Sequence, residues 1–180
     1  MLAPLAMAAV IAPFGLLSQP KPDAPPVQLP PVSADALDKA KLNFPADFSA
    51  PLNLLVLSFA RDQQDEADTW FKAAGEAQAV LPKVQFWMFP VSAREDVLYK
   101  WWLNSSMRSS VPRDEPLHNI VPLFVNKQEF LKSLAIPSEK QIVVLLTDKD
   151  GIVLWRGEGS ATEEKKASLA GFLKSSPLAH

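Results

Sequence analysis

The chain contains 180 residues, with 18 basic and 20 acidic side chains, a net charge of −2 and no cysteine. The missing cysteine excludes thiol redox chemistry, disulfides, cysteine-ligated zinc and iron–sulfur clusters. Only two histidines are present, so the chain can supply at most two imidazole groups to a metal site or to a Ser/His/Asp triad. No run of Lys and Arg is available to neutralise phosphates. We therefore expect no cofactor, no metal and no nucleic-acid partner.

Prolines divide the chain into three parts, because ten of the 17 lie at or before Pro51. Residues 1–17 are uncharged and almost entirely apolar, which is typical of a signal peptide or short membrane anchor. A mis-assigned start or a disordered tail is the alternative. Residues 18–50 predict a proline-rich extended linker and a short helix, and residues 51–176 the folded domain. We expect an exported protein, periplasmic or extracytoplasmic, with a membrane tether as an option; the mitochondrial inner membrane is the alternative location.

The first predicted elements alternate between strand and helix. Ser33 is the expected N-cap of the short helix over residues 33–41. Residues 52–59 form a continuous apolar run, which is typical of a strand buried on both faces. Residues 62–81 place apolar side chains at helical spacing, and residues 84–89 form a second strand. This order predicts a parallel βαβ unit.

A second helix is expected after Ser92, which forms a capping box with Glu95. The apolar face of this helix carries Val97, Leu98, Trp101 and Trp102. Prolines and serines break any period over residues 104–121, so we expect a functional or mobile loop there.

The C-terminal part predicts a helix, a hairpin and a last helix. The first of these helices extends from Asn126 to Leu134. Strands over residues 141–147 and 152–156 flank an Asp-Gly turn, which favours an antiparallel hairpin. The last helix is expected to begin at a capping box of Ser160 and Glu163. It is expected to bury an apolar stripe of Leu169, Ala170 and Leu173.

The order of these elements resembles the thioredoxin-like fold, an α/β fold whose mixed central sheet combines a parallel βαβ unit with a following antiparallel β-hairpin between flanking helices. The resemblance places the redox pair of that fold where the first long strand passes into its helix, here residues 58–64, which contain no cysteine. It also implies a cis-proline before the hairpin, for which Pro137 is the nearest candidate.

Three stretches are similar to the assembly-factor family for the membrane sector of mitochondrial ATP synthase and its bacterial relatives. They are residues 53–59 with Gln63 and Gln64, residues 102–108 with 111–112, and residues 144–148 continuing into 152–164, which end in the pattern Gly-x-Ala-Thr-x-Glu. The similarity spans about residues 50–174. It implies a non-catalytic, chaperone-like function through protein contacts. The client does not carry over, because an export-like segment replaces the transit peptide.

The first candidate site lies at the start of the first helix of the domain. Arg61, Asp62, Gln63 and Gln64 occupy the position of the redox pair, where helix amides favour an anion or an acidic partner group. The alternative is that Asp62 caps the helix and the other side chains are solvated.

Large aromatic and basic side chains supply the other candidates. Trp101 and Trp102 are adjacent, so one of them is expected to be a partly exposed anchor, unless both edges pack in the core along with Tyr99 and Trp87. His118 with Asp114 or Glu115 offers a weak acid–base or metal pair, and a client-binding loop that includes Arg108 and Arg113 is favoured over it. The predicted protein-binding residues are Arg61, Asp62, Gln63, Gln64, Trp102, Arg108, Trp155 and Arg156; the last two could instead cover the sheet edge, with Gly157 and Gly159 supplying backbone freedom.

Together these features predict a non-enzymatic thioredoxin-like domain that binds a membrane-associated protein client and assists assembly. The alternative is a divergent peroxiredoxin or thioredoxin-type oxidoreductase relative with lost or non-cysteine activity. A paralogue that only docks a redox partner is a third possibility.

Overall fold

The structure is a computed structural model that describes residues 26–78, 83–93 and 117–179. Its centre is a five-stranded sheet in the order β5-β4-β3-β6-β7. Strand β3 (Leu52–Ser58) pairs in parallel with β4 (Val84–Ala93) and antiparallel with β6 (Val143–Asp148). Strands β5 (Leu123–Val125) and β7 (Val153–Glu158) lie at the edges. The predicted parallel unit and the predicted antiparallel hairpin are both confirmed.

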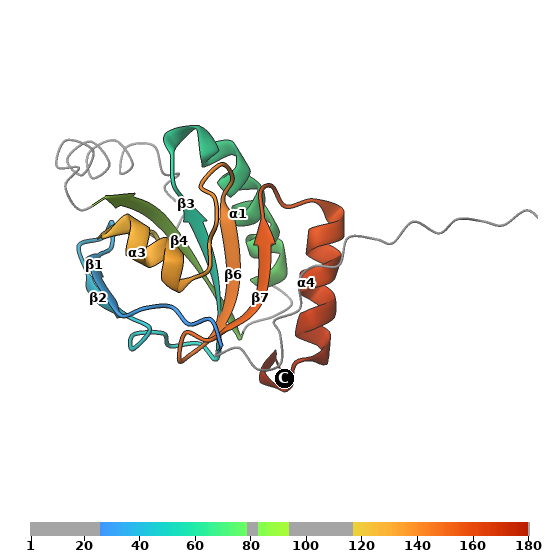
Figure 1. Ribbon diagram of the computed structural model, residues 1–180. Coiled ribbons are helices and arrows are strands. Elements are labelled where there is room, and N and C mark those ends of the chain that lie inside the picture. The colour runs from blue at the N-terminus through green and yellow to red at the C-terminus, as the bar shows by residue number, and fades with distance from the viewer. Residues whose placement is uncertain (1–25, 79–82, 94–116, 180) are drawn as a thin grey trace, which may run out of the picture.

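Helices cover both faces of this sheet (Figure 1). Helix α1 (Gln64–Gln78) and helix α4 (Glu163–Ser175) pack on one face, where Leu54 and Val56 of β3 contribute to the same apolar cluster. Helix α3 (Lys127–Ser133) packs on the other face with the next side chains of β3, Leu55 and Leu57. Successive side chains of a strand point to opposite faces. Two covered faces therefore account for the unbroken apolar run that predicted this strand.

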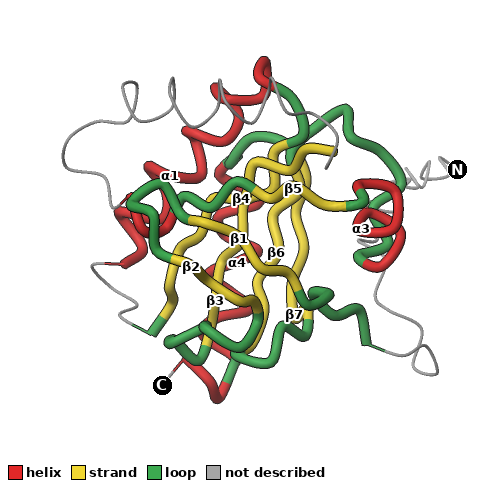
Figure 2. Tube along the Cα trace, turned by 90° about the vertical axis from the view of Figure 1, so that its left-hand side faces the viewer, coloured by secondary structure: helices red, strands yellow, loops and turns green. Residues whose placement is uncertain are grey.

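The helix predicted over residues 33–41 is wrong, because this segment is a hairpin of β1 (Val32–Asp35) and β2 (Lys41–Phe44). Figure 2 shows the hairpin lying across the sheet. Leu42 and Phe44 point into the core at the period of a strand, and the turn is closed where the Ala36 amide donates to the Ala40 carbonyl at 2.8 Å. Lys39 adopts a φ of 76° there, a conformation that ends a helix. Burial of such side chains outweighs the helical propensity of the segment, because propensity is a weak preference that packing overrides.

The packed domain begins well before residue 51. Leu29 is buried, its amide donates to the Gly151 carbonyl at 2.8 Å, and the Val153 amide donates to the Val27 carbonyl at 2.8 Å. The segment around Gln28 thus adds a short bridge to the start of β7. The packed core therefore includes residues that lie before the linker boundary expected at residue 50.

Strand β4 continues four residues beyond the predicted strand, through Pro90 to Ala93. Ser92 pairs with Phe124 of β5 and is buried, so it is not the N-cap of a helix. Strand β5 itself was not predicted. The expected helix with Trp101 and Trp102, and most of the loop over residues 104–121, lie outside the described residues.

Helix termini follow the sequence signals closely. The Asn126 side chain accepts from the Glu129 amide at the start of α3, as predicted. Helix α4 begins two residues later than its predicted box: its N-cap is Thr162, whose side chain accepts from the Lys165 amide. Its buried residues are Leu169 and Leu173, whereas Ala170 is only half-buried. Short 3-10 turns at Arg61–Gln63, Leu117–Asn119 and Pro177–Ala179 complete the described elements.

Pro137 is not a cis-proline: among the described residues, the cis peptide bond is Phe44–Pro45. This places the cis bond after β2 rather than before β6. In the part of the chain that the structure describes, no helix is both long enough and apolar enough to cross a membrane.

Candidate functional site

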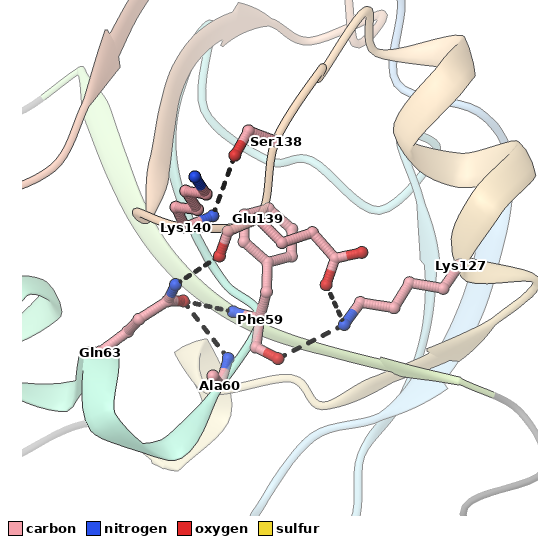
Figure 3. Close-up of polar contacts among 7 residues, drawn as sticks. All are labelled: Phe59, Ala60, Gln63, Lys127, Ser138, Glu139 and Lys140. Atoms are coloured by element: carbon pink, nitrogen blue, oxygen red, sulfur yellow. Dashed lines mark hydrogen bonds and ion pairs between the residues drawn. The ribbon is translucent and has the colours of Figure 1, made fainter.

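The candidate site lies where β3 ends and α1 begins, and its central residue is Gln63 (Figure 3). The Gln63 side chain is buried, with 5% of the residue exposed. Its Oε1 accepts from the backbone amides of Phe59 at 2.7 Å and Ala60 at 3.3 Å, while its Nε2 donates to the Glu139 carbonyl at 2.7 Å. Gln63 therefore joins the end of β3 to the loop that precedes β6.

The way the chain enters the 3-10 turn explains this role of Gln63. The N-cap position of the turn is occupied by Ala60, whose side chain has no acceptor. Asp62 lies inside the turn and is exposed, so it does not occupy the capping position. A helix start leaves amides that need an acceptor. The glutamine three residues later reaches back and accepts from them, as in a capping box.

Lys127, in the first turn of α3, closes the arrangement. Its Nζ lies 2.5 Å from Glu139 Oε2, donates to the Phe59 carbonyl at 3.4 Å, and lies 5.8 Å from the centre of the Phe59 ring. Phe59, Gln63, Glu139 and Lys127 thus form a closed circuit of contacts, which we call the polar ring (Figure 3). The ring fastens together three segments that are distant in sequence.

The other predicted residues of this turn face the solvent. Arg61, Asp62 and Gln64 are exposed, and the Gln64 Nε2 donates to Asp68 Oδ1 on the helix surface at 2.7 Å. Ser138 Oγ accepts from the Lys140 amide at 3.2 Å in the neighbouring loop. The surface next to the polar ring is therefore polar and mixed in charge.

Trp155 and Arg156 make contacts within the protein. Arg156 Nη1 donates to the carbonyls of Leu134 at 3.2 Å and Ala135 at 3.0 Å, which satisfies the C-terminal end of α3. Trp155 Nε1 donates to Ser168 Oγ of α4 at 3.1 Å. These two residues hold α3 and α4 on opposite faces of the sheet. Trp102 and Arg108, by contrast, lie outside the described residues.

Three further side chains of α1 bind backbone atoms across the domain, and sequence reasoning missed them. Glu66 Oε2 accepts from the Ile142 amide at 3.1 Å, Thr69 Oγ1 accepts from the Ala161 amide at 2.8 Å, and Trp70 Nε1 donates to the Gly159 carbonyl at 2.8 Å. Gln63, Glu66 and Thr69 follow one another at intervals of three residues, and Trp70 lies four residues after Glu66. Residues three and four apart lie on the same face of a helix, so this spacing was the sequence signal that could have indicated a shared contact face.

His118 contacts the turn of the first hairpin. Its Nδ1 lies 2.9 Å from Asp38 Oδ2, and its ring centre lies 6.1 Å from that of the buried Trp87. The pKa of Asp38 is lowered, chiefly because its side chain accepts from the Ala40 amide and further because it faces His118. Asp114 and Glu115 lie outside the described residues. Within the described ranges, no three His, Asp or Glu side chains gather as metal ligands would.

A substitution at Gly157 tests the packing position of the Trp155 ring. A Cβ at Gly157 would lie 2.6 Å from Trp155 Cη2, inside van der Waals contact. Gly157→Ala is therefore expected to lower the free energy of unfolding by about 1–3 kcal/mol, since the Trp155 ring must leave its place against α4. Urea denaturation followed by circular dichroism measures the change.

The matched control is Gly171→Ala, in the exposed middle of α4. A Cβ there meets nothing within 4 Å, so the substitution is expected to raise stability by up to about 1 kcal/mol through helix propensity alone. Equal effects of the two alanines would contradict the placement of Trp155 over Gly157.

Comparison with known proteins identifies the fold. No protein-family description and no curated sequence matches the chain. BsSco, a member of the Sco family of cytochrome c oxidase assembly proteins, is 14% identical with a TM-score of 0.62, covering 83% of this chain and 93% of that chain. The pneumococcal exposed lipoprotein thioredoxin Etrx1, from Streptococcus pneumoniae, is 12% identical with a TM-score of 0.54, covering 81% of this chain and 99% of that chain.

A third similar structure is the putative thiol:disulfide interchange protein DsbE from Chlorobium tepidum, at 14% identity and a TM-score of 0.53 over 83% of this chain and 95% of that chain. Structural similarity at identities this low shows a shared fold and does not show a shared chemical activity. The domain has a mixed sheet between helices, matches these three proteins over most of their length, and has no cysteine in its sequence. The chain therefore has a thioredoxin-like fold without the redox cysteines of that fold.

Proposed function

We propose that the protein is a non-catalytic, thioredoxin-like binding domain that assists the assembly of a membrane-associated complex. The observation that carries this proposal is the polar ring. Where the fold would place a dithiol, Gln63 fastens the β3–α1 junction to the loop before β6, and the whole chain contains no cysteine. Such a junction offers a fixed polar surface and no thiol nucleophile.

Two resemblances support the assembly role. One is the resemblance predicted from the sequence, in residues 144–148 and 152–164, to the assembly-factor family for the membrane sector of ATP synthase. The other is the fold of BsSco, a member of the Sco family of cytochrome c oxidase assembly proteins. Both families are named for the assembly of another protein. An extracytoplasmic location is part of the proposal, supported by the apolar residues 1–17 and by the similarity to an exposed lipoprotein.

The proposed contact surface consists of the exposed side chains beside the polar ring. Arg61, Asp62 and Gln64 supply it, with Trp102 and Arg108 as further predicted members. Gln63 supports this surface through its contact with the Glu139 carbonyl, whereas Trp155 and Arg156 bind α4 and the end of α3.

Crosslinked co-purification from a membrane fraction tests the proposal. The double variant Arg61→Ala/Gln64→Ala is expected to reduce client capture at least about fivefold with the melting temperature unchanged, because both side chains are exposed. Lys149→Ala is the matched control, since Lys149 is an exposed residue in the turn after β6, at the opposite end of the sheet. Equal capture by the wild type and the double variant would refute the proposed surface.

The alternative function is that of a divergent redoxin-type oxidoreductase relative whose activity is lost or uses a group other than cysteine. Its support is the fold of DsbE, named a thiol:disulfide interchange protein. Reduction of insulin or consumption of peroxide by the purified chain above the rate of a buffer blank would establish this alternative and overturn the non-catalytic proposal.

A further inference from the structure

Strand β7 is an edge of the central sheet, and the second half of that edge is open (Figure 1). The N-terminal segment covers the first half, because it bonds to Gly151 and Val153 and forms a bridge with Ile152. In the part of the chain that the structure describes, no strand pairs with β7 on this side beyond Val153. An open strand edge is a template for pairing with another chain.

The hydrogen-bond pattern shows which backbone groups of β7 point outward. The Gly159 amide donates to the Ile142 carbonyl at 2.9 Å, and the register places Gly157 two residues further along the same ladder. Hydrogen-bonded and non-hydrogen-bonded pairs alternate along an antiparallel ladder. Gly157 therefore directs its amide and carbonyl at β6, whereas Arg156 and Glu158 direct theirs away from the sheet.

The side chains of Arg156 and Glu158 lie together on one face of this edge. Arg156 reaches the end of α3, whereas Trp155 reaches α4 on the other face, and side chains alternate along a strand. The Glu158 side chain is 51% exposed, and its Oε1 lies 3.3 Å from Arg156 Nη2. This contact is not a hydrogen bond, because Arg156 Nη2 is buried without a hydrogen-bond partner among the described residues. The guanidinium group therefore keeps a donor that its own Glu158 does not use.

A second copy of the chain matches this edge. Two β7 strands that pair antiparallel about Gly157 bring Arg156 of each copy opposite Glu158 of the other. In this register the outward amides and carbonyls of Arg156 and Glu158 form the hydrogen-bonded pairs. Cross-strand pairs of opposite charge stabilise a sheet, and the two-fold axis provides two of them.

The other registers are unfavourable. A shift by one residue sets an outward backbone group against an inward one. Pairing about Arg156 or about Glu158 places that residue opposite its own copy, and like charges directly opposite each other are destabilising. Pairing about Trp155 brings Glu158 opposite Ile152, where the N-terminal segment is already bound. The edge ends at Gly159, whose φ of 70° turns the chain out of the sheet.

We propose that the edge of β7 from Arg156 to Glu158 is the interface of a two-fold symmetric homodimer. Antiparallel pairing of the two β7 strands joins two five-stranded sheets into one. The second copy is the occupant because the charges of this edge complement themselves. The interface is short, so the dimer forms reversibly and its fraction rises with concentration. The inference goes beyond the proposed function, because no member of the polar ring belongs to this edge.

Sedimentation velocity of the full chain over a range of concentrations tests the interface. Glu158→Lys is expected to raise the dissociation constant of the dimer at least about tenfold, because it turns both cross-strand pairs into like-charge pairs. The matched control is Glu129→Lys, which changes the net charge equally at an exposed residue in the first turn of α3. It is expected to keep the wild-type constant. A wild-type monomer at every concentration, or equal effects of the two variants, would overturn the inference.

Hydrogen exchange followed by NMR tests the register without a substitution. The amides of Arg156 and Glu158 are expected to become protected as the concentration rises. The Gly157 amide faces β6 and is expected to be equally protected at every concentration. A chain that dimerises while the Arg156 and Glu158 amides exchange at an unchanged rate would have its interface elsewhere, which refutes the proposal. Should Glu158→Lys lose its fold, this measurement decides alone.

Discussion

Replacing Gln63 by alanine is expected to lower the free energy of unfolding by about 2–3 kcal/mol. The substitution removes the acceptor for the buried Phe59 amide and the donor to the Glu139 carbonyl, and it leaves a small void beside β3. An unsatisfied buried polar group costs about 1–3 kcal/mol. Urea denaturation measures the loss, and hydrogen exchange should show the Phe59 amide exchanging faster than the amides at the centre of β3.

The neighbouring glutamine provides the control for this prediction. Gln64 has the same side chain, is exposed, and makes its hydrogen bond to Asp68 on the surface of α1. Gln64→Ala is therefore expected to change stability by less than about 0.5 kcal/mol. If the two alanine variants were equally stable, the bridge from Gln63 to Glu139 would not exist in solution.

The same pair of residues shows what the sequence could predict of the site. The resemblance to the thioredoxin-like fold located the junction at residues 58–64, and helical periodicity located the helix after it. Nothing in the local pattern distinguishes Gln63 from Gln64, because both are polar residues in the first turn. The difference arises from Glu139, which is 76 residues away in sequence and is brought close only by the sheet.

Lys127 was missed for the same reason. It lies 68 residues from Phe59 in sequence, in a helix that was predicted correctly, and its contact with Glu139 depends on how α3 packs against β3. Local signals predict elements, whereas contacts between elements follow from the packed fold. The polar ring is therefore visible only in the structure.

The fold itself was predictable where burial imposes a period. Strand β3 is apolar at five of its seven positions because both of its faces are covered, and the turn after β6 carries the Asp-Gly signal. Two errors came from weak local signals. Residues 33–41 contain good helix formers, but Leu42 and Phe44 find more buried surface as a strand. Strand β5 has three residues, too few to show an alternation.

Trp70→Ala is expected to have the largest effect of any single substitution considered, a loss of about 3–5 kcal/mol in the free energy of unfolding. Trp70 is 1% exposed, its ring centre lies 6.0 Å from that of Trp155, and its Nε1 donates to the Gly159 carbonyl. Trp70→Phe keeps most of the buried surface and is expected to lose only about 1–2 kcal/mol, mainly through the hydrogen bond. Both losses are measured by urea denaturation.

Phe71→Ala serves as the control for burial on the same helix. Phe71 is half-buried and packs against Phe86 at 4.5 Å between ring centres, so its truncation is expected to cost less than that of Trp70. A larger loss from Phe71→Ala than from Trp70→Ala would contradict the orientation of α1 on the sheet.

A double-mutant cycle then tests why residues 159–162 carry the Gly-x-Ala-Thr pattern. Trp70 donates to the Gly159 carbonyl and Thr69 accepts from the Ala161 amide, so two neighbours on α1 hold one stretch of backbone. Trp70→Phe and Thr69→Val are therefore expected to be non-additive by at least about 0.5 kcal/mol, because loosening either contact frees the same segment. Strict additivity would mean that the two contacts act separately. Coupling would show that the two side chains of α1 hold residues 159–161 as one unit, which gives the Gly-x-Ala-Thr pattern a structural reason.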